Sequence, residues 1–105
     1  MAEKIETLEG LFGEKIHYRD GEKIGESWPG LLGGSYDHYD AQGNPLGSSE
    51  PGLFADLEHY DARGEHVGST QRGLLGTWEH YDREGHWGTT NDTLWGETTW
   101  IDEER

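Results

Sequence analysis

The chain has no cysteine, one methionine and three prolines in 105 residues. A disulfide framework is therefore excluded, and cysteine usage gives no information about the redox compartment. Hydrophobic residues make up 30% of the chain, and no stretch approaches the roughly 18 consecutive apolar residues of a membrane helix. The N-terminal sequence lacks the basic and apolar regions of a signal peptide. These absences predict a cytoplasmic protein.

Basic residues are also scarce, because 8 Lys and Arg stand against 22 Asp and Glu, which gives a formal net charge of −14. Nucleic acids and anionic membrane surfaces bind clustered Lys and Arg, so this charge would repel both. The composition predicts a cationic, neutral or apolar partner, either a protein or an apolar small molecule.

Aromatic residues and glycine are plentiful, with five Trp, five Tyr, two Phe and 17 Gly. A chain of this length forms one small domain, residues 1–105, and its core must be thin. We expect that core to consist mostly of aromatic rings and leucine.

The most informative pattern is an internal repeat. The dipeptide His-Tyr recurs every 21 residues, a Gly-Leu-Leu or Gly-Leu-Phe sequence opens each unit, and an apolar residue followed by Gly closes it. Repeats of such a period are supersecondary units that stack on their neighbours. The units are residues 10–29, 30–51, 52–72 and 73–92, with a fifth formed by 93–105 together with 1–9.

Each unit is predicted to be a β-hairpin. Asp and Gly occupy the first and fourth positions of type I turns, and the first unit has a shorter Asp-Gly centre typical of a type I′ turn. Short strands rich in aromatic and hydroxyl residues flank the turns, and no window shows a helical apolar stripe. The fold class is all-β. The turn sequences are Asp20-Gly21, Asp40 to Gly43, Asp61 to Gly64 and Asp82 to Gly85.

The two ends of the chain are complementary halves of one hairpin. Residues 3–5 match the returning strand at 22–24, Leu94-Trp95-Gly96 aligns with Leu74-Leu75-Gly76, and Trp100-Ile101-Asp102 aligns with His80-Tyr81-Asp82. An open row of hairpins would leave two unpaired edges, whereas pairing the halves removes them. The sequence therefore predicts a closed shallow barrel of five hairpins with about ten antiparallel strands.

The repeated frame, Leu-Leu/Phe-Gly followed by His-Tyr-Asp-x-x-Gly and Gly-x-Ser, resembles that of uncharacterised bacterial repeat proteins with the β-flower fold. That fold is a shallow barrel whose hairpins radiate as petals, and the resemblance covers nearly the whole chain. The family has no established activity, so the resemblance implies a fold and no function.

The recurring histidines suggest a metal ring, but their spacing argues against one. Equivalent residues on successive hairpins lie about 9–10 Å apart, whereas each ligand of a zinc ion lies about 2 Å from the metal. We predict that the His-Tyr pairs form a packing and hydrogen-bond ladder, with Asp fixing each turn. No metal and no cofactor are predicted.

Pairs of large apolar residues occupy the connections between hairpins, which in a ring must converge at one end. The favoured interpretation is that they form the core. The alternative is the wall of a shallow pocket for an apolar ligand, because a ring of about ten strands is wider than its side chains fill. The candidate ligand-binding residues are Phe12, Leu32, Phe54, Leu75 and Trp95.

Tryptophan is concentrated in the last third of the chain, which is consistent either with a stacking surface or with variation in core volume. No catalytic residues are predicted, because the serines lack a nucleophile-elbow pattern and the acidic residues are explained as turn and surface positions. The Trp residues of this last third are Trp78, Trp87, Trp95 and Trp100, and the fifth Trp of the chain is Trp28.

Five similar units make a symmetric surface, whereas catalysis usually needs one asymmetric group of residues. The sequence therefore favours a non-enzymatic structural or protein-interaction module. The alternative is a carrier that holds a small apolar or lipid-like ligand in the central opening, and a filled axis would exclude it. Association of rings through the apolar end predicts a homo-oligomer.

Overall fold

A computed structural model describes residues 3–31, 33–53, 55–94 and 96–102. Ten β-strands make up its regular structure. They are β1 (Lys4–Glu9), β2 (Lys15–Arg19), β3 (Glu22–Pro29), β4 (Tyr36–Asp40), β5 (Pro45–Pro51), β6 (Leu57–Asp61), β7 (His66–Arg72), β8 (Trp78–Asp82), β9 (Gly85–Asp92) and β10 (Gly96–Ile101).

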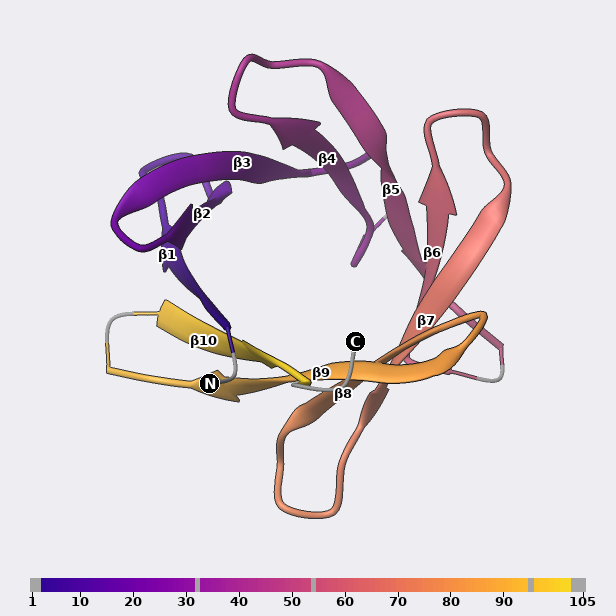
Figure 1. The fold of residues 1–105 in the computed structure, drawn as a ribbon. Coiled ribbons are helices and arrows are strands. Elements are labelled where there is room, and N and C mark those ends of the chain that lie inside the picture. Colours follow the sequence, from indigo (N-terminus) through magenta and orange to yellow (C-terminus); the bar gives the residue numbers. More distant parts are fainter. Residues whose placement is uncertain (1–2, 32, 54, 95, 103–105) are drawn as a thin grey trace.

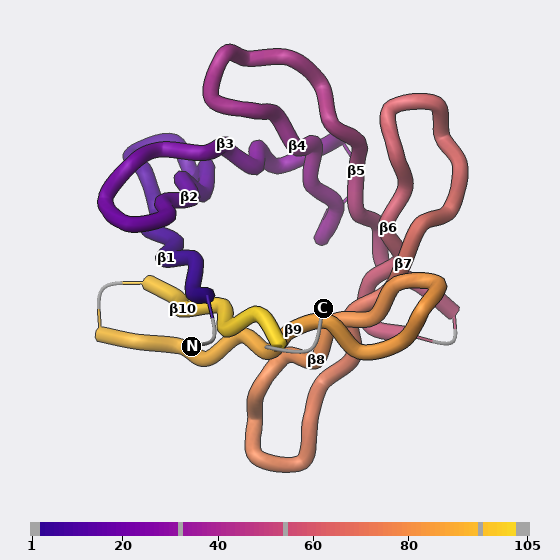
Figure 2. Tube along the Cα trace, viewed as in Figure 1, coloured from indigo at the N-terminus to yellow at the C-terminus, as the bar shows by residue number. Residues whose placement is uncertain are grey.

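The strands form one closed antiparallel barrel in which each pairs with its neighbours in sequence and β1 pairs with β10 (Figure 1). Lys4 lies opposite Trp100 and Leu8 opposite Gly96, so the terminal strands close the ring. The Cα trace shows the hairpins radiating around a central space (Figure 2). The predicted all-β ring of five hairpins is confirmed, and every strand of the barrel has two partners.

The hairpin turns follow the predicted chemistry with one exception. Asp40 Oδ1 accepts hydrogen bonds from the backbone N–H groups of Gln42 at 2.9 Å and Asn44 at 2.8 Å, and Gly43 has a φ of 86°. The fourth turn differs, because Asp82 lies directly opposite Gly85. Its loop therefore has two residues, as in the first hairpin, and is one residue shorter than those of the second and third.

A β-bulge interrupts the same place in four hairpins. Gly47 lies opposite His38 and Pro45 opposite Tyr39, which leaves Leu46 as the extra residue. A Cβ atom on Gly47 would lie 2.0 Å from the carbonyl oxygen of Tyr60 on the next hairpin. The apolar residue before each glycine is thus the bulge, and the glycine allows the next hairpin to approach. The bulge residues are Ile24, Leu46, Val67 and Trp87.

In the fifth hairpin, the predicted alignment of Trp100 with His80 is wrong by one residue. Thr99 lies opposite Thr90 as His80 lies opposite Thr70, so Thr99 and not Trp100 takes the position of the histidine. The connection before β10 is one residue shorter than its counterpart, since Thr93 N donates to Gly96 O whereas the equivalent Gly73 N donates to Thr77 O. Gly96 therefore matches Thr77, which shifts the whole strand by one residue.

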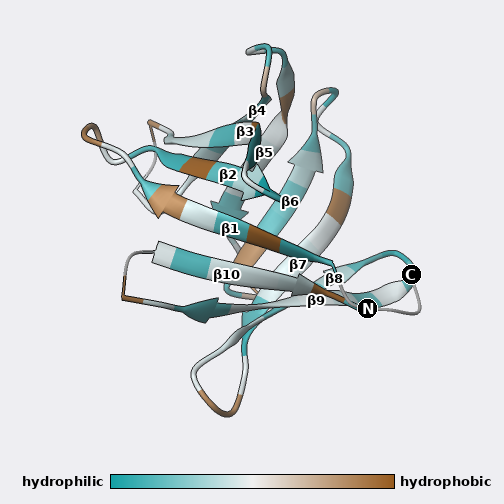
Figure 3. Ribbon diagram, turned by 60° about the vertical axis from the view of Figure 1, so that its left-hand side comes forward, coloured by the Kyte–Doolittle hydropathy of each residue, from teal (hydrophilic) through white to brown (hydrophobic). Residues whose placement is uncertain are grey.

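The two rims of the barrel differ in chemistry. The antiparallel order places the hairpin turns at one rim and the connections between hairpins at the other. The tips of these connections carry apolar residues, whose ribbon is coloured brown in Figure 3, and their side chains are exposed. Their exposed fractions run from 76% for Phe12 to 107% for Leu31. We call this set the apolar rim: Leu11, Phe12, Leu31, Leu53, Leu74, Leu75 and Leu94.

The connections between hairpins lie at one end of the barrel, as predicted. The interpretation of their apolar side chains as the core is wrong for those that the structure describes. Among the described residues no hydrophobic side chain is fully buried. The most buried side chains are hydroxylic, with Thr70 and Ser49 each 2% exposed. The expected interior of aromatic rings and leucine is thus replaced by a polar one. In the same residues there is no helix long and apolar enough to cross a membrane.

Candidate ligand-binding cavity

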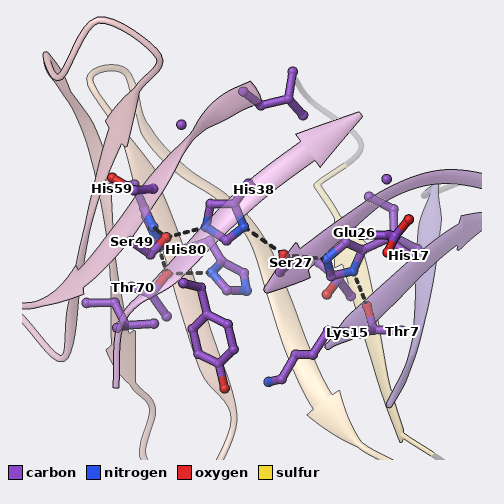
Figure 4. Close-up of a pocket in the computed structure, with 18 of the residues that line it drawn as sticks. Thr7, Lys15, His17, Glu26, Ser27, His38, Ser49, His59, Thr70 and His80 are labelled. Atoms are coloured by element: carbon purple, nitrogen blue, oxygen red, sulfur yellow. Dashed lines mark hydrogen bonds between the residues drawn. The ribbon is translucent and has the colours of Figure 1, made fainter. Parts of the chain in front are cut away.

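A belt of hydroxyl and imidazole side chains runs around the inside of the barrel, with one residue from each strand. Nine hydrogen bonds of 2.6–2.8 Å join its members in succession. Figure 4 shows the bonds from Thr7 toward His80. In strand order the belt is Thr7, His17, Ser27, His38, Ser49, His59, Thr70, His80, Thr90 and Thr99.

The alternation of residue types matches the distance between strands. Neighbouring strands lie about 4.8 Å apart, and an imidazole offers a nitrogen at each of two edges. Ser49 Oγ is 2.6 Å from both His38 Nε2 on β4 and His59 Nδ1 on β6. A neutral imidazole has one donor and one acceptor, and a hydroxyl can both donate and accept. The belt residues between His17 and Thr90 therefore satisfy one another's polar groups.

The surroundings of the four belt histidines favour the neutral imidazole. Burial lowers the pKa of His17 and His38, and it lowers the pKa of His59 and His80 to about 4. The neighbouring histidines act in the same direction, because a charge on one opposes a charge on the next. Neutral imidazoles are the form that the alternating hydrogen bonds require.

The belt surrounds a cavity of about 480 Å³. A barrel of ten strands is wider than the eight-stranded barrel that side chains just fill, which explains the space. Toward the hairpin turns, the cavity wall is an apolar collar made of Ile5 and the four bulge residues. Within the collar, Trp87 stacks on His80 with ring centroids 4.9 Å apart. We define the apolar collar as Ile5, Ile24, Leu46, Val67 and Trp87.

The other end of the cavity carries charged groups. Lys15 Nζ lies 3.5 Å from Glu97 Oε1 and 5.2 Å from the centroid of the Tyr36 ring. A second hollow of about 370 Å³ shares Lys15, Glu97 and Thr7 with the cavity. The interior is therefore amphipathic along the barrel axis, with an apolar end, a self-satisfied polar belt and an end with one ion pair.

Of the five residues predicted to bind a ligand, the structure describes two, and neither is among the residues that line this cavity. Phe12 and Leu75 lie on the apolar rim, 76% and 93% exposed, and are not among the lining residues. The other three candidates, Leu32, Phe54 and Trp95, lie outside the described residues. Their contact with a ligand stays a prediction. Of the tryptophans, Trp87 lines the cavity, whereas Trp100 is 43% exposed.

The hydrogen-bond ladder of the histidines is confirmed, but its partners are Ser and Thr rather than Tyr. A signal for them exists in the repeat frame, because Gly-x-Ser or Gly-x-Thr follows each bulge residue. Assigning inward and outward residues by simple alternation along the strand does not identify these hydroxyls, because the bulge changes which residues face inward. The hydroxyls concerned are those of Ser27, Ser49, Thr70 and Thr90.

No family model, curated protein or solved structure matches this chain. The class that the fold and the cavity define is a closed ten-stranded antiparallel β-barrel, built from sequential hairpins and lined by a His, Ser and Thr ladder. Function must therefore be argued from the cavity itself.

Proposed function

We propose that this protein binds a small, largely apolar molecule inside the barrel and acts as a carrier or sensor of that molecule. The observation behind the proposal is the cavity of about 480 Å³, which lies in the size range of small-molecule sites. Its collar supplies apolar contact, and its belt presents few unpaired polar groups, because the belt atoms bond to one another. Both features favour an apolar body over a strongly hydrated one.

The experiment is a titration with N-phenyl-1-naphthylamine, an uncharged probe whose fluorescence rises in apolar surroundings. Binding is expected to be saturable and to be lost in Leu57→Trp, because Leu57 lines the cavity. Tyr36 occupies the equivalent position on β4, opposite Ser49 as Leu57 is opposite Thr70, and it lines the cavity, so the fold already holds a large ring there. Leu74→Trp is the matched control, since Leu74 is 104% exposed on the apolar rim. Equal binding by both variants would contradict the proposal.

A second candidate function, a protein-interaction module, is supported by the apolar rim. Large apolar side chains gathered at loop tips mark contact sites more often than isolated ones do. Analytical ultracentrifugation of the protein and of Leu31→Ser tests self-association through this rim. A concentration-dependent dimer that Leu31→Ser weakens would support a homo-oligomer, whereas a monomer at all concentrations would contradict it.

Both candidates are non-enzymatic. The serines of the belt use their hydroxyls in a repeated structural pattern, since Ser27 and Ser49 each bond to two imidazoles. Membership of the β-flower family is likewise proposed, supported by the closed ring of radiating hairpins. The partner in the carrier role is an apolar small molecule, and a cytoplasmic location is likewise proposed. The charge of −14 disfavours nucleic acids and anionic membranes as partners.

A further inference from the structure

The belt departs from its own repeat at one place. In four hairpins, a histidine stands between the hydroxyl of the strand before it and the hydroxyl of the strand after it. Between Thr90 on β9 and Thr7 on β1, the corresponding residue on β10 is Thr99. A threonine is shorter than a histidine by most of a ring and offers a single polar atom.

The chain of hydrogen bonds consequently stops there. Thr99 Oγ1 is 2.6 Å from Thr90 Oγ1, and in the part of the chain that the structure describes, the side-chain bond of Thr7 Oγ1 is the one to His17 at 2.8 Å. Thr7 lies opposite Glu97, and Thr99 lies opposite Ile5. The two threonines are thus diagonal neighbours, with backbones about 7–8 Å apart. His80 spans the same diagonal to Thr90 with its imidazole, whereas no hydrogen bond joins the hydroxyls of the two shorter threonines in the described residues.

The place between these hydroxyls opens into the cavity. Thr7, Thr90 and Thr99 all line it, and Thr7 also lines the second hollow beside Lys15 and Glu97. Thr7 is 4% exposed, so the remaining hydrogen-bonding capacity of its hydroxyl lies in the interior, where an unmade hydrogen bond is costly.

We propose that this place is a headgroup subsite for a neutral azole, such as an imidazole or pyrazole ring, carried on an apolar body. The ring would take the position that a fifth histidine would have, with one edge toward Thr99 and the other toward Thr7. Four examples in the same barrel show that a ring with one donor and one acceptor bridges two hydroxyls on alternate strands. The inference rests on the proposed function, because the apolar body occupies the cavity and contacts its collar.

The charge at this end of the cavity selects against an anionic headgroup. Glu97 lies directly opposite Thr7, and Lys15 is already its partner at 3.5 Å. A carboxylate ligand would therefore be repelled by the carboxylate of Glu97 and would have to share Lys15 with it. The protein's net charge of −14 adds to this repulsion. A neutral donor and acceptor pair meets no such repulsion.

The test compares two ligands of similar shape at pH 8, where an imidazole is neutral. 4-Phenylimidazole has the donor and acceptor, and 3-phenylthiophene does not. Isothermal titration calorimetry is expected to give about ten-fold tighter binding for the imidazole, the effect of one to two net hydrogen bonds. Thr99→His fills the place and should abolish this preference. Thr99→Val should reduce it, and Thr98→Val, on the neighbouring outward position of β10, should leave it unchanged.

Equal affinities for the two ligands, or a preference that survives both Thr99→His and Thr99→Val, would overturn the subsite. If Thr99→His does not fold, which its circular dichroism spectrum reports, Thr99→Val decides the matter alone. Should neither ligand bind while N-phenyl-1-naphthylamine does, the subsite is refuted and the carrier function stands. Failure of all three probes would refute both.

Discussion

Replacing Thr70 by valine removes the hydroxyl that joins two of the belt histidines while keeping the shape of the side chain. Thr70 is 2% exposed, and its Oγ1 lies 2.6 Å from His59 Nε2 and 2.8 Å from His80 Nδ1. Valine can bond to neither nitrogen. Since a buried polar atom without a partner costs about 1–3 kcal/mol, we expect Thr70→Val to lower the free energy of unfolding by about 2–4 kcal/mol.

The assay is reversible thermal unfolding at pH 7.5, followed by circular dichroism. A domain of about this size loses roughly 4–8 °C of Tm per kcal/mol, so Thr70→Val should melt some 10–25 °C below the unsubstituted protein. Thr70→Ser keeps the hydroxyl and should recover most of this loss, because Ser49 occupies the equivalent position of another hairpin. Thr98→Val, facing away from the belt, serves as the matched control.

A result in which Thr70→Val and Thr98→Val melt within a degree or two of each other would refute the reasoning. It would mean that the hydrogen bonds of the belt contribute no net stability, and that backbone pairing around the closed ring holds the barrel together by itself. A low Tm for Thr70→Ser equal to that of Thr70→Val would refute it also, because the hydroxyl would then be irrelevant.

Three further outcomes are expected. With the pKa of His59 and His80 lowered to about 4 from 6.5, the unfolded chain binds protons there that the folded chain does not. Stability should therefore be full above pH 6.5 and fall as the pH drops toward 4, by up to about 1.4 kcal/mol per pH unit for each histidine; urea titrations at a series of pH values measure this slope, and a flat profile contradicts it. Gly47→Ala should prevent cooperative folding in a melting experiment, since its Cβ would lie 2.0 Å from a backbone carbonyl, whereas Gly33→Ala, with no atom within 4 Å, should melt normally. Leu74→Ser should change the free energy of unfolding by less than about 0.5 kcal/mol, because that side chain is 104% exposed; a larger loss would show that the apolar rim is packed.

The fold could be predicted from the sequence because it depends on sequence features that lie close together along the chain. The turn residues Asp40 and Gly43 act within four positions, and the half-hairpins at the two ends share their pattern with the complete ones. Closure of the barrel then follows, because the two half-hairpins at the ends of the chain together make one complete hairpin. The alignment of β10 was wrong by one residue because Thr99 replaces a histidine and the preceding connection is shorter, and neither change leaves a turn signal.

The cavity could not be predicted in the same way, because inward and outward positions depend on the bulge. Reading alternation across Leu46 and Gly47 without the bulge places the wrong residues inside. Apolar character is also a poor guide to burial here: Leu31 is 107% exposed while Ser49 is 2% exposed. In most domains the largest apolar residues form the interior, but in this wide ring a network of hydrogen-bonded polar side chains takes that place.

The succession of hydrogen bonds around the belt gives the interior a sense of rotation. Each neutral imidazole donates one hydrogen bond and accepts one, and each belt hydroxyl can do the same. A change of direction part-way along the belt would leave one hydroxyl hydrogen without an acceptor in the belt. The four imidazoles then share one tautomer, and the dipoles of their N–H bonds point the same way along the open chain from Thr7 to Thr99. Reversing the direction of these hydrogen bonds requires all four imidazoles to change tautomer together. Nitrogen-15 chemical shifts of the imidazoles distinguish the two tautomers and would show which direction is present.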